Sequence, residues 1–286
     1  MKKIKLIAID LGRTLLTDAN KITEKNKIAI EYAKSKGIII VMATARMYSS
    51  TKYISHSISA DYGVFGNGSQ IMDLNNKKIY FQRAIKEKYV NLIIDYARKN
   101  NLYIHIDLEY EEVSEEYDYF TKKHLLLNEH YSDQLKSNVR LVDDLKSYIK
   151  GKKIIKIIVA SEDDLSKHIE KILELTNQEV FLNEHCKNIY EKIIGKTYNY
   201  AEFGGTPTTK ASGVHYLATL LKIPKSQIMA IGDLENDIEL LSTIGIPVVM
   251  RNAKDCIKEH AVYITKEDNN NSGVADAIYK MVGEKE

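Results

Sequence analysis

Residues 6–16 read Leu-Ile-Ala-Ile-Asp-Leu-Gly-Arg-Thr-Leu-Leu, and this stretch decides how the rest of the chain is interpreted. Four apolar residues are followed by one carboxylate, Asp10, and then by a short Gly-Arg-Thr turn. Such a run is typical of a buried central strand that presents its carboxylate at the sheet edge where open α/β sheets bind ligands. The simpler alternative is that Asp10 caps a turn, because aspartate is common where strands end. Three stretches far along the chain distinguish these alternatives.

The composition is that of an ordinary globular protein. The chain has 286 residues, 44% hydrophobic and 28% charged, which is enough for one large domain or two with a real core. Its 41 basic and 39 acidic residues give a net charge of +2, so we expect neither nucleic acid nor a membrane as partner. Cys186 and Cys256 show no disulfide or zinc pattern, and no apolar run reaches the length of a membrane helix. We expect a cytoplasmic protein that is a monomer or a homodimer.

Two segments at opposite ends of the chain share one pattern, in which strands alternate with helices. In residues 1–82 we expect strands at 4–10, 37–43 and 62–65, helices at 23–36 and 48–57, and a hairpin over 70–81. The pattern resumes after residue 204, with strands at 227–231, 246–250 and 262–265 and helices over 210–221 and from 273. This alternation predicts right-handed crossovers and a mainly parallel α/β sheet.

The segment between them, residues 83–203, has a different character. A helix near residues 90–97 is followed by expected strands at 101–107, 110–113, 153–160, 179–182 and 198–203. Ser161 and Asp164 have the spacing of a capping box, which predicts that a helix begins there. The segment is long enough to be a separate, inserted α+β domain.

Two of the expected strands, one from each end of the chain, finish on an aspartate, Asp10 and Asp233. If these strands are neighbours in one parallel sheet, both carboxylates reach the same cleft, where their repulsion raises the pKa of one of them. A hard cation relieves that repulsion, and carboxylates with few other protein ligands suit Mg²⁺. Thr44, at the end of a third strand, and Lys210, at the start of a helix, add a hydroxyl donor and a positive charge. Together these groups predict a site for phosphoryl chemistry.

On these motifs the chain resembles the haloacid dehalogenase-like phosphatases, in particular the Cof-type hydrolases, over nearly its whole length. The family's Asp-x-Asp-Gly-Thr-Leu corresponds to residues 10–15, and its Gly-Asp-x-x-Asn-Asp is intact at 232–237. Further matches are Thr44-Ala45-Arg46, Asn67-Gly68, Lys210, Asn252-Ala253 and Gly273-Val274-Ala275. The resemblance implies a Rossmann-like, mainly parallel three-layer sandwich core, formed by residues 1–82 and 204–286, with residues 83–203 as an inserted α+β cap domain.

The resemblance also implies a role for each matching residue. In such enzymes the first aspartate attacks phosphorus and forms an aspartyl-phosphate, which water then hydrolyses; here that residue is Asp10. Mg²⁺ would be held by Asp10, the backbone carbonyl of Gly12, Asp233 and Asp237, the last of which would orient Lys210 or a metal-bound water. Thr44 and Lys210 would act in catalysis and hold the phosphoryl oxygens of a small phosphorylated metabolite. The further substrate-binding candidates that match the family are Asn67 and Arg46. Arg13 does not match it, and its guanidinium would either enter the site and bind phosphate or block the site.

The chain departs from the family at positions 12 and 13. Gly12 stands where the family has a second aspartate, which protonates the leaving group and then activates water, and Arg13 replaces a glycine. General acid–base catalysis contributes about 10²–10⁴-fold. Three hypotheses follow. The first is a phosphoric monoester hydrolase impaired towards alkyl phosphates, and the second is a catalytically inactive protein that binds phosphate or a phosphometabolite as a sensor or partner-binding module. The third is an aspartyl-phosphate trap, in which phosphorylated Asp10 persists for lack of a base. No substitute acid is obvious, since Asp18 lies in the following loop with no geometric reason to bring it in.

Overall fold

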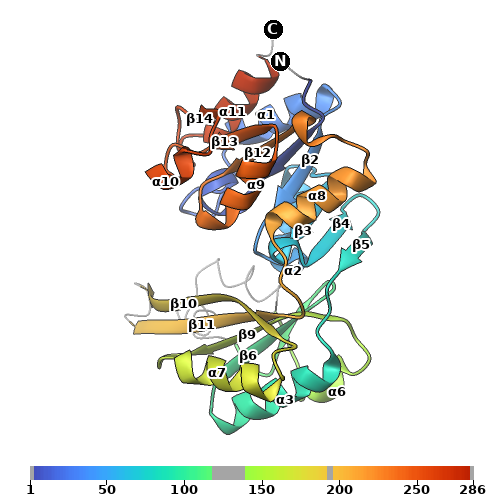
Figure 1. Ribbon diagram of the computed structural model, residues 1–286, viewed down its shortest axis with the longest axis vertical. Helices are drawn as coiled ribbons and strands as arrows, with labels where there is room; N and C mark the ends of the chain where they lie inside the picture. Colours follow the sequence, from blue (N-terminus) through green and yellow to red (C-terminus); the bar gives the residue numbers. More distant parts are fainter. Residues whose placement is uncertain (1–2, 118–138, 192–195, 284–286) are drawn as a thin grey trace. The chain divides into compact units, whose positions relative to one another are not determined.

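The structure is a computed structural model that describes residues 3–117, 139–191 and 196–283 (Figure 1). The chain divides into two compact units. The first comprises Met1–Met47, Thr51–Gln82 and Thr208–Glu286, and the second comprises Tyr48–Ser50 and Arg83–Pro207. Within the described ranges, no helix combines the length and the apolar character that are needed to cross a bilayer.

The first unit is built on an eight-stranded sheet. All neighbouring strands from β14 to β3 are parallel, and β4 and β5 add an antiparallel hairpin at one edge. In sheet order the strands are β14 (Tyr263–Ile264), β13 (Ile246–Val249), β12 (Ile228–Gly232), β1 (Leu6–Ile9), β2 (Ile39–Ala43), β3 (Tyr62–Phe65), β4 (Gln70–Asp73) and β5 (Lys78–Gln82). The central strand β1 therefore lies between β12, from the C-terminal segment, and β2, from the N-terminal one.

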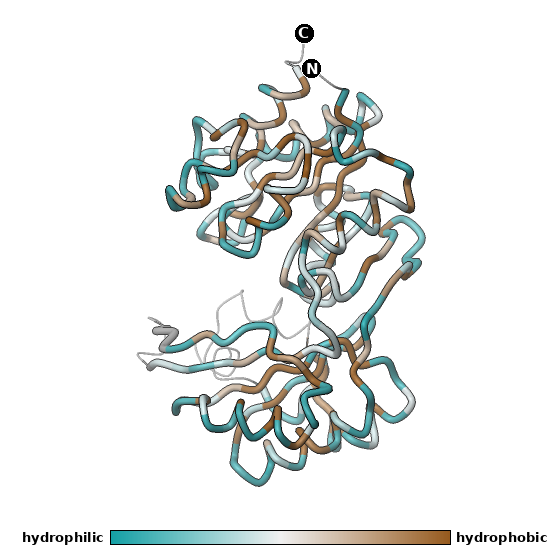
Figure 2. Tube along the Cα trace, viewed as in Figure 1, coloured by the Kyte–Doolittle hydropathy of each residue, from teal (hydrophilic) through white to brown (hydrophobic). Residues whose placement is uncertain are grey.

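Helices cover both faces of this sheet. Alternate strand residues, Leu6 and Ala8 on β1 among them, pack with α8 and α9 into one apolar core, and the intervening residues are equally buried on the opposite face. There α1 and α11 pack against each other, and Figure 2 shows the central strands as the most hydrophobic part of the unit. The helices are α1 (Glu24–Ser35), α2 (Tyr48–Ser57), α8 (Lys210–Leu220), α9 (Ile238–Thr243), α10 (Asp255–Lys258) and α11 (Gly273–Val282). The predicted α/β class, with a mainly parallel three-layer core, is confirmed.

Helix α8 begins where the sequence supplies a cap. The hydroxyl of Thr209 accepts a hydrogen bond from the Ser212 amide at 3.1 Å, and the hydroxyl of Ser212 accepts one from the Thr209 amide at 3.0 Å. This reciprocal pair satisfies backbone donors that the first helical turn leaves free. It makes Lys210 the first residue of the helix, which decides where that lysine enters the unit.

The second unit is a six-stranded sheet with helices on one face. Its strands are antiparallel except for the β7–β8 pair, and α3, α6 and α7 enclose its apolar core. In sheet order the strands are β10 (Phe181–Glu191), β11 (Lys196–Gly204), β9 (Ile154–Ser161), β6 (Tyr103–Leu108), β7 (Glu112–Ser114) and β8 (Val139–Leu141). The helices are α3 (Glu87–Lys99), α6 (Leu145–Ile149) and α7 (Ser166–Leu175). The predicted α+β character of the inserted segment is confirmed.

Two local predictions in this unit are wrong. Ser161 does not cap a helix: it is the last residue of β9, paired with Asn199, and its hydroxyl accepts a hydrogen bond from the Asp163 amide at 3.0 Å. Helix α7 starts only at Ser166, after Leu165, which has no polar side chain to cap it. Strand β10 runs well beyond the predicted end at residue 182, because its polar residues lie on an edge strand that hydrogen-bonds to β11.

Candidate active site

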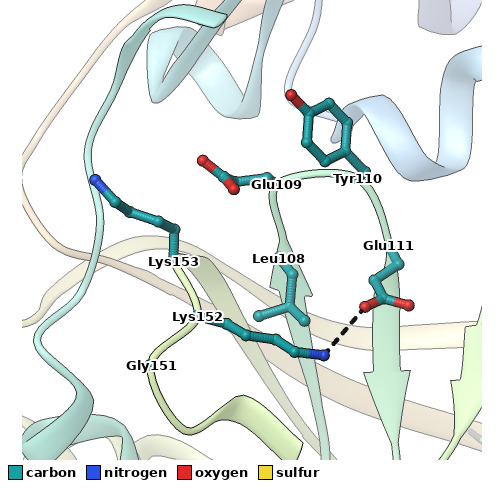
Figure 3. A pocket seen from close by; sticks show the side chains of 7 residues that line it. All are labelled: Leu108, Glu109, Tyr110, Glu111, Gly151, Lys152 and Lys153. Carbon is teal, nitrogen blue, oxygen red and sulfur yellow. Dashed lines mark ion pairs between the residues drawn. The ribbon is translucent and has the colours of Figure 1, made fainter.

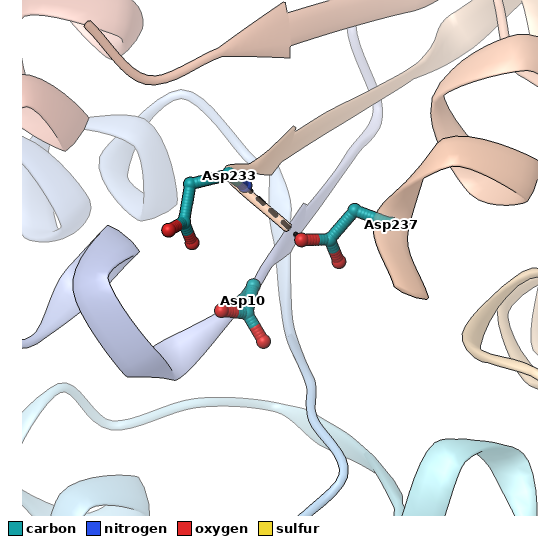
Figure 4. Close-up of side chains that lie close together, drawn as sticks. All are labelled: Asp10, Asp233 and Asp237. Atoms are coloured by element: carbon teal, nitrogen blue, oxygen red, sulfur yellow. Dashed lines mark hydrogen bonds between the residues drawn. The ribbon is translucent and has the colours of Figure 1, made fainter. Parts of the chain in front are cut away.

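Two strand ends bring Asp10 and Asp233 together. Strands β1 and β12 are parallel neighbours with Ile9 opposite Ile231, and the Asp10 amide donates to the Ile231 carbonyl at 3.0 Å. Asp237 follows four residues after Asp233, and one carboxylate oxygen from each of the three aspartates lies within 4.8 Å of the others (Figure 4). All three side chains are buried. The Asp10 side chain makes no capping hydrogen bond to the described turn that follows it, so the turn-cap alternative is excluded.

Lys210 places a positive charge in direct contact with two of these carboxylates. Its Nζ lies 2.7 Å from Asp10 Oδ1 and 2.8 Å from Asp237 Oδ1, and the residue is 2% exposed. Burial opposes the charge on Lys210, but the two aspartates outweigh it and raise the lysine pKa above its usual value. The side chain therefore stays protonated. The mild cost of a cation at a helix start is offset by these two partners.

Asp237 connects this lysine to the backbone of its own loop. Its Oδ2 accepts a hydrogen bond from the amide of Asp233 at 3.0 Å (Figure 4). The same oxygen accepts one from the amide of Leu234 at 3.1 Å, while Oδ1 accepts the bond from Lys210. Both oxygens are thus engaged. Of the two roles that the sequence suggested for Asp237, these contacts fit the orientation of Lys210 directly.

The two carboxylate oxygens of Asp233 differ in their hydrogen bonding. Its Oδ1 accepts a hydrogen bond from the Thr14 hydroxyl at 2.6 Å, whereas its buried Oδ2 has no hydrogen-bond partner among the described residues. Burial raises the pKa of Asp233 to about 6 and that of Asp10 to about 7, the latter against the opposing charge of Lys210. An orphaned, buried carboxylate oxygen is costly, and an all-oxygen donor set suits a hard divalent cation. The residues present therefore fit Mg²⁺.

The turn after Asp10 contains the two residues that depart from the family pattern. Gly12 has an ordinary backbone conformation (φ −66°, ψ 123°), and a Cβ there would meet no described heavy atom within 4 Å apart from its chain neighbours. Arg13 adopts the left-handed conformation (φ 56°, ψ 10°) that glycine tolerates best. Asn252 holds this strained residue by donating to its carbonyl oxygen at 2.9 Å. The Arg13 side chain is 57% exposed, with Nε 3.9 Å from Asp233 Oδ2.

Thr44 and Asn67 follow the ends of the next two strands of the sheet, β2 and β3. Thr44 is buried at the end of β2; its carbonyl accepts a hydrogen bond from the Asn67 amide at 3.0 Å and its hydroxyl accepts one from the Arg46 amide at 3.2 Å. The Asn67 side chain accepts a bond at 3.5 Å from Asn236, whose own Oδ1 is 3.3 Å from Lys210 Nζ. A contact chain therefore links Asn67 to the lysine. The Arg46 guanidinium is directed to Asn20, at 3.3 Å.

A family model described as haloacid dehalogenase-like hydrolase matches residues 7–278 of the chain. The chain belongs to this family. A 5-amino-6-(5-phospho-D-ribitylamino)uracil phosphatase of Bacillus subtilis is 29% identical over 280 residues, which cover 98% of this chain and 96% of that protein. Among solved structures, a haloacid dehalogenase-like hydrolase from Bacteroides thetaiotaomicron has a TM-score of 0.80 at 22% identity, covering 98% of this chain and 100% of its own. A Thermotoga maritima protein also has a TM-score of 0.80, at 21% identity and 98% coverage of both chains.

Three residues of the site make contacts that the sequence did not predict. Thr14 binds Asp233, Asn236 touches Lys210, and Asn252 supports Arg13. Thr14 and Asn236 both lie inside the quoted family motifs, so their positions carried a signal. Asn252 was quoted as a match, but its partner is a backbone carbonyl 239 residues away, which local spacing does not reveal.

A separate pocket of about 430 Å³ lies in the second unit (Figure 3). Its charges are largely paired, since Glu111 lies 3.5 Å from Lys152 Nζ and 3.4 Å from Arg140 Nε. The Lys152 ammonium also lies 3.3 Å from the centre of the Tyr148 ring. The lining residues are Leu108, Glu109, Tyr110, Glu111, Gly151, Lys152 and Lys153. The residues that the sequence predicted for the active site all belong to the first unit.

Proposed function

We propose that the protein is a Mg²⁺-dependent phosphatase that acts on small phosphorylated metabolites through an aspartyl-phosphate at Asp10. The observation that carries this proposal is the pairing of Asp10 and Asp233 at adjacent strand ends, with Lys210 2.7 Å from Asp10 and one Asp233 oxygen left without a hydrogen-bond partner among the described residues. The family match and the phosphatase name of the Bacillus subtilis relative support it. Residues 83–203 would form the cap domain that selects the substrate.

Each residue has a distinct task in this proposal. Asp10, Asp233 and the carbonyl of Gly12 would hold Mg²⁺, which neutralises charge on the phosphoryl group and on the carboxylates. Lys210, Thr44 and Asn67 would bind the phosphoryl oxygens. Asp237 would contribute by holding Lys210 in place, as the hydrogen bonds of its two oxygens support. Arg46, bonded to Asn20, is a more distant substrate-binding candidate.

Gly12 restricts which substrates react well. It has no side chain to protonate a departing oxygen, and this loss weighs most on alkyl phosphates, whose leaving groups are strongly basic. Aryl and acyl phosphates have leaving groups of low pKa that depart as anions. We therefore expect hydrolysis of p-nitrophenyl phosphate and acetyl phosphate to exceed that of sugar phosphates.

The test is a phosphatase panel measured with Mg²⁺ and with a chelator. Asp10→Asn should abolish Mg²⁺-dependent hydrolysis, because an amide is neither a nucleophile nor an anionic metal ligand. Asp255→Asn is the matched control: the Asp255 side chain is 97% exposed and pairs only on the surface, with Lys258, so hydrolysis should be retained. Turnover that survives Asp10→Asn would refute the proposal.

One observation favours a second candidate function, phosphate binding without turnover. The Arg13 guanidinium lies 3.9 Å from Asp233 Oδ2, so it places a fixed positive charge next to an oxygen that Mg²⁺ would need. Arginine also binds phosphate in a two-pronged geometry. Saturable binding of phosphate in a calorimeter, with no hydrolysis of any panel substrate, would support this candidate. Mg²⁺-dependent turnover that disappears in Asp10→Asn would exclude it.

A further inference from the structure

We propose that the aspartyl-phosphate formed at Asp10 persists after the leaving group has departed, so that the protein accumulates in a phosphorylated form when it meets an acyl phosphate. This inference rests on the proposed function, because it requires Asp10 to be the nucleophile. It goes further by assigning the slow step to the water reaction and by naming the substrate class that loads the protein.

The first support is the open space at position 12. A base at that position would have to remove a proton from the water that attacks the phosphoryl group. Gly12 keeps an ordinary backbone conformation, and a Cβ would meet no described heavy atom within 4 Å beyond the adjacent residues. The place of a side chain at position 12 is therefore open, and no described side chain beyond the adjacent residues fills it.

The second support is that Asp18, a carboxylate in the loop that follows this turn, is already engaged. Both oxygens of Asp18 accept hydrogen bonds, from Asn269 at 3.0 Å and from Asn270 at 2.9 Å. The Asp18 amide in turn donates to the Asn270 side chain at 3.0 Å, which fixes the loop. The hydrogen bonds from the two asparagines lower the pKa of Asp18, so this carboxylate is a weak base as well as a bound one.

The third support is the side chain next to the open position. Arg13 remains protonated in proteins and cannot accept a proton from water. Its Nε lies 3.9 Å from Asp233 Oδ2, at the same strand ends as Asp10, and more than half of its side chain is exposed. A guanidinium there stabilises a phosphoryl dianion by charge-assisted hydrogen bonds. It therefore favours the phosphorylated state and does not assist its hydrolysis.

The two chemical steps depend differently on a proton-transfer group. In the first, an Asp10 oxygen forms a bond to phosphorus while the bond from phosphorus to the acyl oxygen breaks, and the carboxylate leaves with the electron pair. That leaving group needs no proton, since carboxylic acids have pKa values of about 4. In the second, a water oxygen forms a bond to phosphorus and loses a proton, while the bond from phosphorus to the Asp10 oxygen breaks, so that inorganic phosphate leaves and the Asp10 carboxylate is regenerated. Only this second step needs a base, so the loss of about 10²–10⁴-fold falls on breakdown of the phosphorylated form.

The experiment is to mix the full chain with Mg²⁺ and acetyl phosphate, quench in acid and measure the intact mass. We expect a product heavier by one phosphoryl group, which neutral hydroxylamine removes because it cleaves acyl phosphates. The adduct should be absent in Asp10→Asn and present in Asp255→Asn. An adduct that resists hydroxylamine, or that forms in Asp10→Asn, would overturn the inference.

A matched pair at position 12 tests the missing base directly. Gly12→Asp should shorten the lifetime of the adduct by about 10²–10⁴-fold, whereas Gly12→Asn, which has the same shape and no basic carboxylate, should leave it nearly unchanged. Both side chains fit, because the backbone conformation is ordinary and the space is open. Equal lifetimes in the two variants would overturn the inference.

Two further outcomes separate this inference from the proposed function. Steady Mg²⁺-dependent hydrolysis of acetyl phosphate by the native chain, with no adduct in the quenched samples, would overturn the persistent intermediate and leave the phosphatase standing. The absence of both turnover and adduct would overturn both.

Discussion

Replacing Lys210 with methionine should expose how strongly the buried acids depend on this one cation. The lysine is 2% exposed and contacts Asp10 at 2.7 Å and Asp237 at 2.8 Å. Methionine has a similar length and no charge, so the change leaves the buried carboxylates of Asp10 and Asp237 close together without the lysine that contacts both. Removing one partner of a buried ion pair typically costs about 3–5 kcal/mol. We expect a loss of this size in the free energy of unfolding at neutral pH in a chelator.

The same variant should have a marked pH dependence. In the native protein the pKa of Asp10 is about 7, against 3.8 in an unfolded chain, so the folded state binds more protons between these values. This contribution to stability is full below pH 4 and is lost as pH rises through about 7. Without Lys210, which lowers the Asp10 pKa, the decline should extend to higher pH.

Urea unfolding of native and variant protein at pH 5 and pH 8 measures both effects. The cost of Lys210→Met should be smaller at pH 5, where the acids take up protons, than at pH 8. Lys254→Met is the control: its partner Glu235 is also exposed, so the free energy of unfolding should be nearly unchanged at either pH. A small cost for Lys210→Met that is the same at both pH values would refute the reasoning.

Two further substitutions test the packing around the site. Thr14→Val should destabilise the protein by about 1.5–3 kcal/mol, because it removes the 2.6 Å hydrogen bond to Asp233 Oδ1. Neither oxygen of this buried carboxylate would then accept a hydrogen bond from the described residues. Urea unfolding measures the loss, and an unchanged free energy of unfolding would contradict the prediction. Gly68→Ala should cost about 2 kcal/mol or more, because Gly68 has φ +91° and an added Cβ would lie 2.4 Å from the Thr209 carbonyl oxygen. Gly12→Ala is the control, because its backbone conformation is ordinary and the space is open, so the free energy of unfolding should be unchanged or slightly higher. An equal loss in the free energy of unfolding for the two variants would contradict this reasoning.

Much of the fold could be predicted because its signals are local. The strand at Tyr62–Phe65 and helix α2 were located to the residue, since an apolar run or a helical repeat is contained within the element itself. The start of α8 at Lys210 is likewise local, because the residues that cap it, Thr209 and Ser212, are close in the sequence. The false capping box at Ser161 shows the limit of such signals. A serine three residues before an aspartate caps a helix only if the chain turns there, and pairing of β9 with β11 keeps Ser161 in a strand.

The sequence by itself determined that Asp10 and Asp233 each end a buried strand and that Gly12 lacks a proton-transfer group, because each is a property of a few adjacent residues. Only the tertiary structure decided what surrounds these groups. It joined Lys210 to Asp10 across 200 residues, left Asp233 Oδ2 without a hydrogen bond from the described residues, and tied Asp18 to Asn269 and Asn270. Such contacts depend on which strand ends meet at one edge of the sheet. Backbone pairing between strands that are distant in the sequence determines this order, and the local spacing of residues does not reveal it.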